Sequence, residues 1–74
     1  MAEVTFEEDG PDTIARVDGV IIGRLTGQGP NRQMQWREGH DYDQAKVEAF
    51  DHGYAASDRS PEAARRELKK AGFA

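Results

Sequence analysis

The chain of 74 residues contains no cysteine, which excludes disulfide bonds, thiolate metal sites and cysteine nucleophiles. It also lacks any apolar run near the roughly 20 residues with which a helix crosses a bilayer. Acidic residues stand as early as Glu3 and Glu7, whereas a signal peptide begins with basic ones. These absences favour a cytoplasmic protein in a reducing compartment, with no membrane partner.

The net charge of −4 is distributed in blocks along the chain. Residues 1–12 hold five acidic side chains and no basic one, and residues 38–52 hold five against Lys46 alone. Residues 13–37 and 53–74 carry more basic than acidic side chains. Because nucleic-acid binding depends on neutralising phosphates, the overall acidity disfavours general polyanion binding. The blocks still allow one acidic face and one basic face.

The first half of the chain predicts a small β-sheet. We expect residues 1–74 to form one small domain, because a chain of this length suffices for one core. Extended apolar segments between turn-forming residues predict strands at about 3–8, 13–17, 20–26 and 33–37. The strongest signal is Asp18-Gly19, which is typical of a two-residue hairpin turn. Since the connections are short, the strands are expected to form an antiparallel meander.

Two helices are expected after the strands, at about 43–54 and 61–71. In the first, apolar side chains recur at helical spacing. Asp41 followed by Gln44 resembles a capping box at its start. Gly53 is expected to end or weaken this helix, because glycine has a low helix propensity.

The second helix carries signals at both ends. Ser60 suits the N-cap and Pro61 the first helical position. Gly72 suits the C′ position, after which Phe73 would contact Leu68 in a Schellman motif. The predicted fold is therefore α+β, a four-stranded antiparallel β-meander with two C-terminal helices packed on one face.

The predicted hairpin places apolar residues on both faces of the sheet. With a two-residue turn, Ala15 lies opposite Ile22. One face then carries Ala15, Val17, Val20 and Ile22, and the second face carries Ile14, Arg16, Ile21 and Leu25. Two short helices cover only one face. The second face is therefore either covered by the side-chain stems of Arg16 and Arg24, or it is an interface with a partner protein or a second copy of the chain.

Few residues are candidates for catalysis or metal binding. The cluster with metal-ligating side chains consists of His40, Asp41, Asp43, Asp51 and His52. Asp41 and Asp43 are better explained as acids at a helix N-terminus, where the helix dipole favours negative charge. A hydrolase would also need an activated serine, and the serine that starts the second helix is explained as a cap. We predict no catalytic residue, no metal and no cofactor, and hence not an enzyme.

A basic group at the end of the chain offers an alternative function. The bases are Arg59, Arg65, Arg66, Lys69 and Lys70. Four of them share one broad side of the second helix and could contact the phosphates of a nucleic acid. The competing explanation is a solvated face with pairing between Glu62 and Arg66.

The chain resembles two groups of small proteins. Its length, acidity, lack of cysteine and strands followed by helices resemble accessory proteins of phages and mobile elements, including anti-CRISPR proteins. That resemblance implies a protein that blocks a host complex by occupying a surface. Residues 6–10 followed by 14–17 also resemble the first hairpin of HicB-type antitoxins, which implies an antitoxin-like partner protein. The strand-like segment 33–37 departs from that pattern, in which a helix follows the third strand closely.

The expected function is a small acidic protein-binding module, an inhibitor or adaptor that blocks a basic surface of a host nucleic-acid-binding complex. The second face would supply apolar contact area, and the acidic segments would steer a basic partner. The expected partner-binding residues are Ile14, Arg16, Ile21, Leu25, Glu7, Glu8, Asp9, Asp12, Asp41 and Asp43. The alternatives are nucleic-acid binding through the basic helix and an antitoxin-like role.

Overall fold

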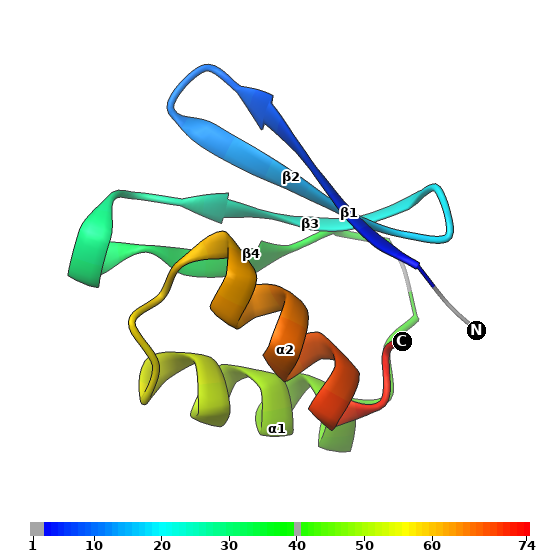
Figure 1. Cartoon of the computed structure of the whole chain (residues 1–74). Helices are drawn as coiled ribbons and strands as arrows, with labels where there is room; N and C mark the ends of the chain where they lie inside the picture. Colours follow the sequence, from blue (N-terminus) through cyan, green and yellow to red (C-terminus); the bar gives the residue numbers. More distant parts are fainter. Residues whose placement is uncertain (1–2, 40) are drawn as a thin grey trace.

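The computed structural model describes residues 3–39 and 41–74. Four strands form one antiparallel sheet in the order β1-β2-β3-β4, and both helices lie on the same side of it (Figure 1). The elements are β1 (Val4–Asp9), β2 (Asp12–Val17), β3 (Val20–Thr26), a 3₁₀ turn (Gly29–Asn31), β4 (Gln33–Trp36), α1 (Gln44–Ala55) and α2 (Pro61–Ala71). The predicted α+β fold is confirmed.

The strand ends follow from the turns between them. Gly10 has a positive φ of 61°, which allows a two-residue turn in which Asp9 pairs directly with Asp12. β1 and β2 therefore reach one residue further toward this turn than predicted. β3 has the predicted ends, and β4 stops one residue earlier than expected.

The β2–β3 hairpin contains a bulge that the sequence pattern did not predict. Val17 pairs with Val20 and Arg16 with Ile21, as expected, but Ala15 pairs with Gly23. The expected pairing of Ala15 with Ile22 is therefore wrong, because β3 contains one extra residue at this point. The extra residue reverses the alternation that follows it.

Leu25 changes face because of this bulge. The sequence placed Leu25 on the second face, but its side chain is 1% exposed and lies in the core, so that prediction is wrong. Ile22 is also buried. Residues 22 and 25 point to the same face only because the extra residue interrupts the period-two alternation.

Gly23 lies where β3 and β4 approach closely. A Cβ atom on this residue would lie 2.6 Å from the carbonyl oxygen of Gln35 and 2.9 Å from Sδ of Met34. Only a residue without a side chain fits this space. The glycine is therefore part of the reason that the bulge and the β3–β4 pairing coexist.

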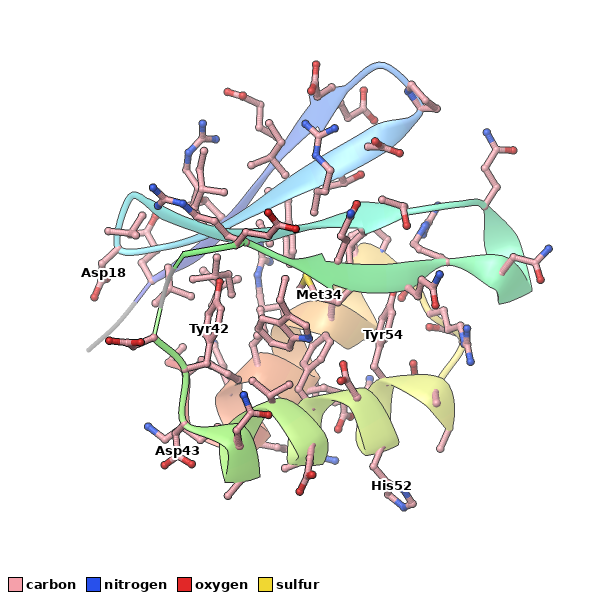
Figure 2. The ribbon with its side chains drawn as sticks, turned by 180° about the vertical axis from the view of Figure 1, so that it is seen from behind. Asp18, Met34, Tyr42, Asp43, His52 and Tyr54 are labelled. Atoms are coloured by element: carbon pink, nitrogen blue, oxygen red, sulfur yellow. The ribbon has the colours of Figure 1, made fainter. Side chains whose placement is uncertain are left out.

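The core lies between the sheet and the two helices. Its members are Val4, Ala15, Ile22, Leu25, Met34, Phe50, Tyr54, Ala63, Ala64 and Leu68. Figure 2 shows Met34 and Tyr54 pointing into this space from opposite sides. Trp36 closes one end, with its ring edge-on to Phe50 and to Tyr42.

α1 begins with a different cap from the one predicted. The carboxylate of Asp43 accepts a hydrogen bond of 2.9 Å from the N–H of Ala45, so Asp43 is the N-cap. The capping box of Asp41 with Gln44 is therefore wrong. The helix runs through Gly53 and ends at Ala55, one residue beyond the predicted end, and a Cβ atom on Gly53 would overlap the carboxylate of Glu67. Gly53 is thus a point of close packing between the helices.

α2 has the predicted signals at both ends. The Ser60 hydroxyl accepts a hydrogen bond from the N–H of Ala63 at 3.1 Å. Gly72 adopts the left-handed conformation with φ of 96°. The N–H of Phe73 donates to the carbonyl of Leu68 at 2.9 Å, which completes the Schellman motif. This motif holds Phe73 against the core.

Candidate interaction surface

The face of the sheet opposite the helices, here called the outer face, consists of Thr5, Glu7, Ile14, Arg16, Ile21, Arg24 and Gln35. Glu7, Ile14, Arg24 and Gln35 form one cross-strand row, and Thr5, Arg16 and Ile21 form the next. Directly paired residues point to the same face. The outer face therefore has two isoleucines surrounded by charged and polar side chains, and neither helix covers it.

Ion pairs connect the acidic β1–β2 turn to the arginines of the outer face. Arg24 pairs with Asp9 at 2.7 Å and with Asp12 at 3.1 Å. Arg16 pairs with Glu7 at 3.5 Å. Exposed pairs of this kind contribute little to stability. They do reduce the negative field of three predicted partner-binding acids, whereas the exposed Glu8 has no ion pair among the described residues.

The arginines leave part of the outer face open. A hollow of about 280 Å³ has an apolar part formed by Ile14 and Ile21, and charged sides formed by Arg24, Arg37 and Glu38. Arg37 donates to the carbonyl of Ile21 at 3.4 Å. The arginine side chains therefore cover the outer face only in part.

The two exposed large hydrophobic side chains of the described residues are neighbours on β3. Val20 is 46% exposed and Ile21 is 37% exposed. Ile21 points to the outer face, because it pairs with Arg16, and Val20 points to the other face, because it pairs with the core-facing Val17. Together they make the end of the β2–β3 hairpin an apolar edge between the two faces.

A second hollow of about 410 Å³, here called the tip cleft, lies on the Val20 side of this edge. The apolar lining of the cleft consists of Val17, Val20, Ile22, Tyr42, Gly72 and Phe73. Its charged rim consists of Asp18, Asp41, Asp43 and Lys46. In Figure 2, Asp18 at the hairpin turn and Asp43 at the start of α1 lie on the same side of the molecule, with Tyr42 between them.

The structure brings two of the predicted partner-binding residues to the tip cleft. Asp41 and Asp43 line the cleft, and Ile14, Arg16 and Ile21 lie on the outer face. The sequence reasoning missed Asp18, Val20 and Phe73 as members of a surface site. The sequence could have indicated Asp18, because the turn residue of a hairpin is exposed at the end of two strands.

A hydrogen bond from Tyr42 connects the lining of the tip cleft to β3. The Tyr42 hydroxyl donates to the carbonyl of Ile22 at 2.5 Å. Burial raises the pKa of the Tyr42 hydroxyl above its usual value, although the nearby Arg37 acts in the opposite direction. The hydroxyl therefore stays protonated at neutral pH and remains a donor.

The predicted basic group makes contacts within the chain. The guanidinium of Arg59 donates to the carbonyl of Arg32 at 3.0 Å, and Arg32 donates back to the carbonyl of Arg59 at 3.1 Å. Arg65 lies over the ring of Phe6, with its Cζ 5.4 Å from the ring centre. Arg66 and Lys70 pair with Glu67, at 3.4 Å and 3.8 Å. Lys69 is exposed on the same helix.

The predicted metal-ligating residues are dispersed. His40 lies outside the described residues, and Figure 2 shows His52 pointing away from the molecule. The Asp51 carboxylate accepts a hydrogen bond of 3.3 Å from the indole N–H of Trp36. Among residues 3–39 and 41–74, no group of three or more histidine, aspartate or glutamate side chains is close enough to hold a metal ion.

Comparison with known proteins found no match to a family model, a curated protein or a solved structure. Within the described part of the chain, neither helix combines the length and the hydropathy that crossing a membrane requires.

Proposed function

We propose that this protein is a non-catalytic protein-binding module that docks on its partner through the end of the β2–β3 hairpin. The observation that carries the proposal is the exposure of Val20 and Ile21 as adjacent large hydrophobic residues with a hollow on each side. Exposed apolar residues surrounded by polar ones are typical of interaction sites. A partner that covers this edge would bury apolar surface on both faces of the hairpin.

The serine hydroxyls that a hydrolase would need support a non-catalytic role. The Ser57 hydroxyl donates to the carbonyl of Tyr54 at 2.6 Å and accepts from the N–H of Arg59 at 3.0 Å. The Ser60 hydroxyl caps α2. A nucleophilic serine requires a general base within hydrogen-bonding distance, whereas both of these hydrogen bonds of the Ser57 hydroxyl are made with backbone groups.

The charge around the hairpin end favours a basic partner. Asp18, Asp41 and Asp43 surround the tip cleft, against one base, Lys46. Complementary charge speeds association and selects partners more than it adds affinity. An inhibitor or adaptor of the anti-CRISPR type, which blocks a basic surface of a host nucleic-acid-binding complex, fits this distribution.

The test begins by capturing the partner from host lysate and purifying it. Binding of the pure partner is then measured by calorimetry for the wild-type protein, Ile21→Asp and the control Ala49→Asp. Ala49 is exposed on α1, so this control adds the same charge away from the hairpin. We expect Ile21→Asp to weaken binding at least about tenfold, which corresponds to about 1.4 kcal/mol. Wild-type affinity in folded Ile21→Asp, verified by circular dichroism, would overturn the proposal.

Two other outcomes would replace the proposal. If sedimentation shows a wild-type dimer that Ile21→Asp dissociates, the hairpin end binds a second copy of the chain instead. If the wild-type protein shifts duplex DNA or RNA in a salt-dependent manner and Arg65→Glu with Lys69→Glu abolishes the shift, the basic helix binds nucleic acid. An antitoxin-like protein would appear in the capture experiment with a toxin as its partner.

A further inference from the structure

We infer that the tip cleft receives an arginine side chain of the partner protein. The inference rests on the proposed function and specifies the chemistry of one contact within it. The cleft has a volume of about 410 Å³, which is in the range of sites that hold ligands of modest size. Three separate parts of the chain form it, namely residues 17–22, residues 41–46 and residues 72–73.

The apolar surface of the cleft is held in place by contacts within the chain. The Tyr42 hydroxyl donates to the carbonyl of Ile22, and the Schellman motif at the end of α2 fixes the backbone of Phe73. The rings of Tyr42 and Phe73 meet at 75°, with their centres 6.4 Å apart. A side chain that enters the cleft thus meets a preformed surface, which lowers the entropic cost of binding.

Two of the carboxylates at the rim are also held in place. Oδ1 of Asp18 accepts the N–H of Glu3 at 2.7 Å, and Oδ1 of Asp43 accepts the N–H of Ala45 at 2.9 Å. Among residues 3–39 and 41–74, no hydrogen bond or ion pair occupies the Oδ2 atom of either residue, or the carboxylate of Asp41. The rim therefore offers fixed acceptors to a cationic donor.

The one base at the rim is engaged elsewhere. Lys46 Nζ donates to the carbonyl of Gly72 at 3.2 Å, at the C-terminal end of α2. A cation is stable there because the carbonyl groups at a helix C-terminus carry negative partial charge. Lys46 therefore contributes to the α1–α2 packing, and three acids against one base leave the cleft with net negative charge.

The arrangement of acids and apolar surface selects the occupant. The carboxylates are too dispersed for a metal ion, since no group of three among the described residues could hold one. A long side chain with an apolar stem and a cationic end would contact Val17 and Val20 along its length and the carboxylates at its end. Arginine is favoured over lysine because its planar guanidinium stacks on aromatic rings and forms bidentate bonds with carboxylates.

The test is a titration of ¹⁵N-labelled protein by NMR with the capped peptide acetyl-Gly-Arg-Gly-amide. Peptides with lysine or citrulline in place of arginine are titrated in parallel. We expect saturable shifts of the backbone amides of Asp18, Val20, Tyr42 and Phe73, with a dissociation constant in the millimolar range. The citrulline peptide, which has the same shape without the charge, should bind at least about fivefold more weakly, and the lysine peptide should bind measurably more weakly.

The variants are Asp18→Asn with Asp41→Asn, and the control Glu48→Gln with Glu62→Gln, whose two acids are exposed on the helices and do not line the cleft. Asparagine tolerates the positive φ of 52° at position 18 and keeps the Oδ1 acceptor, so the turn is preserved. Both double variants remove two negative charges, but only the first removes them from the cleft. We expect at least about fivefold weaker arginine binding in the first variant and unchanged binding in the control.

Three results would overturn the inference. They are no saturable shift up to 20 mM peptide, shifts that lie outside the cleft, and equal weakening in both double variants. Equal affinity for arginine and lysine would overturn the assignment of the guanidinium. The result is separate from the proposed function, because Ile21→Asp tests partner binding on the outer face, whereas the peptide requires no partner. Failure of the peptide titration therefore leaves the partner-binding test of the proposed function intact, and failure of the partner-binding test leaves the peptide titration intact.

Discussion

Replacement of Gly23 by alanine is the most direct test of the hairpin geometry. Glycine within a strand normally costs stability, so a sequence-based view predicts that alanine would stabilise β3. The structure predicts the opposite. The new Cβ atom would lie 2.6 Å from the carbonyl oxygen of Gln35, whereas a carbon–oxygen contact in a sheet is about 3.3–3.6 Å.

The size of the effect follows from two opposing terms. Forcing an extra methyl group into a packed site costs about 1–3 kcal/mol. Alanine also lowers the conformational entropy of the unfolded chain, which raises the free energy of unfolding by about 0.5–1 kcal/mol. We expect the packing cost to lie in the upper part of its range, because the obstructing atom is the backbone carbonyl oxygen of Gln35, which cannot rotate away. We therefore expect a net loss of about 1–2 kcal/mol, or about 4–16 °C in Tm for a domain of this size.

The assay is urea and thermal unfolding, followed by far-ultraviolet circular dichroism and by tryptophan fluorescence. Trp36 is the one tryptophan of the chain, and its Cα would lie 3.2 Å from the new methyl group. Gly53→Ala is the matched control, because it also adds one methyl group at a glycine without positive φ. There the obstacle is the end of the Glu67 side chain, which can move, and alanine favours the helix by about 1 kcal/mol.

We expect Gly53→Ala to stay within about 1 kcal/mol of the wild-type protein, since displacement of Glu67 offsets the gain in helix propensity. Gly23→Ala should lose clearly more. The reasoning about the bulge is refuted if Gly23→Ala is as stable as the wild-type protein or more so. A loss of equal size in both variants would show that the cost is general to glycine replacement and not specific to the approach of β3 and β4.

Two further predictions concern the helical layer. Ser60→Ala should cost about 1 kcal/mol in urea unfolding, because the Ala63 N–H loses its acceptor, whereas Ser60→Asp should retain most of the stability; equal losses would contradict the cap. Burial raises the pKa of Asp51 above its usual value of 3.8, while the hydrogen bond from Trp36 acts in the opposite direction. The protonated carboxyl therefore stabilises the folded state below pH 3.8, and this contribution is lost as the pH rises through the folded-state pKa. Asp51→Asn, which keeps the acceptor, should therefore gain stability relative to wild type between pH 3 and pH 7, and a constant difference would contradict the shift.

Local signals accounted for most of the secondary structure. Asp18-Gly19 made the two-residue turn between β2 and β3 predictable, and Ser60, Pro61 and Gly72 defined both ends of α2. Each of these signals acts within a few residues, through the φ angles of the turn or through backbone groups at a helix end. The failures concern elements whose limits depend on distant contacts. The role of Gly53 is one example, because the glycine in α1 makes room for the carboxylate of Glu67 on α2.

The surface site was predictable only in part. The sequence identified Ile14 and Ile21 on the uncovered face and placed Asp41 and Asp43 near a helix start. It could not bring those acids together with Asp18, because the hairpin turn and the start of α1 meet only when the helices pack on the sheet. The ion pairs that neutralise the β1–β2 turn likewise depend on β3 lying beside β2.

The sequence alone determined the lack of cysteine and the charge blocks, which are properties of composition. It also determined the meander and the ends of α2, because turn chemistry and helix capping act over short distances along the chain. The faces of the β3 side chains beyond the bulge were decided by the tertiary structure. One extra residue at the bulge moved Leu25 into the core, since a strand alternates with a period of two and any insertion reverses the faces beyond it.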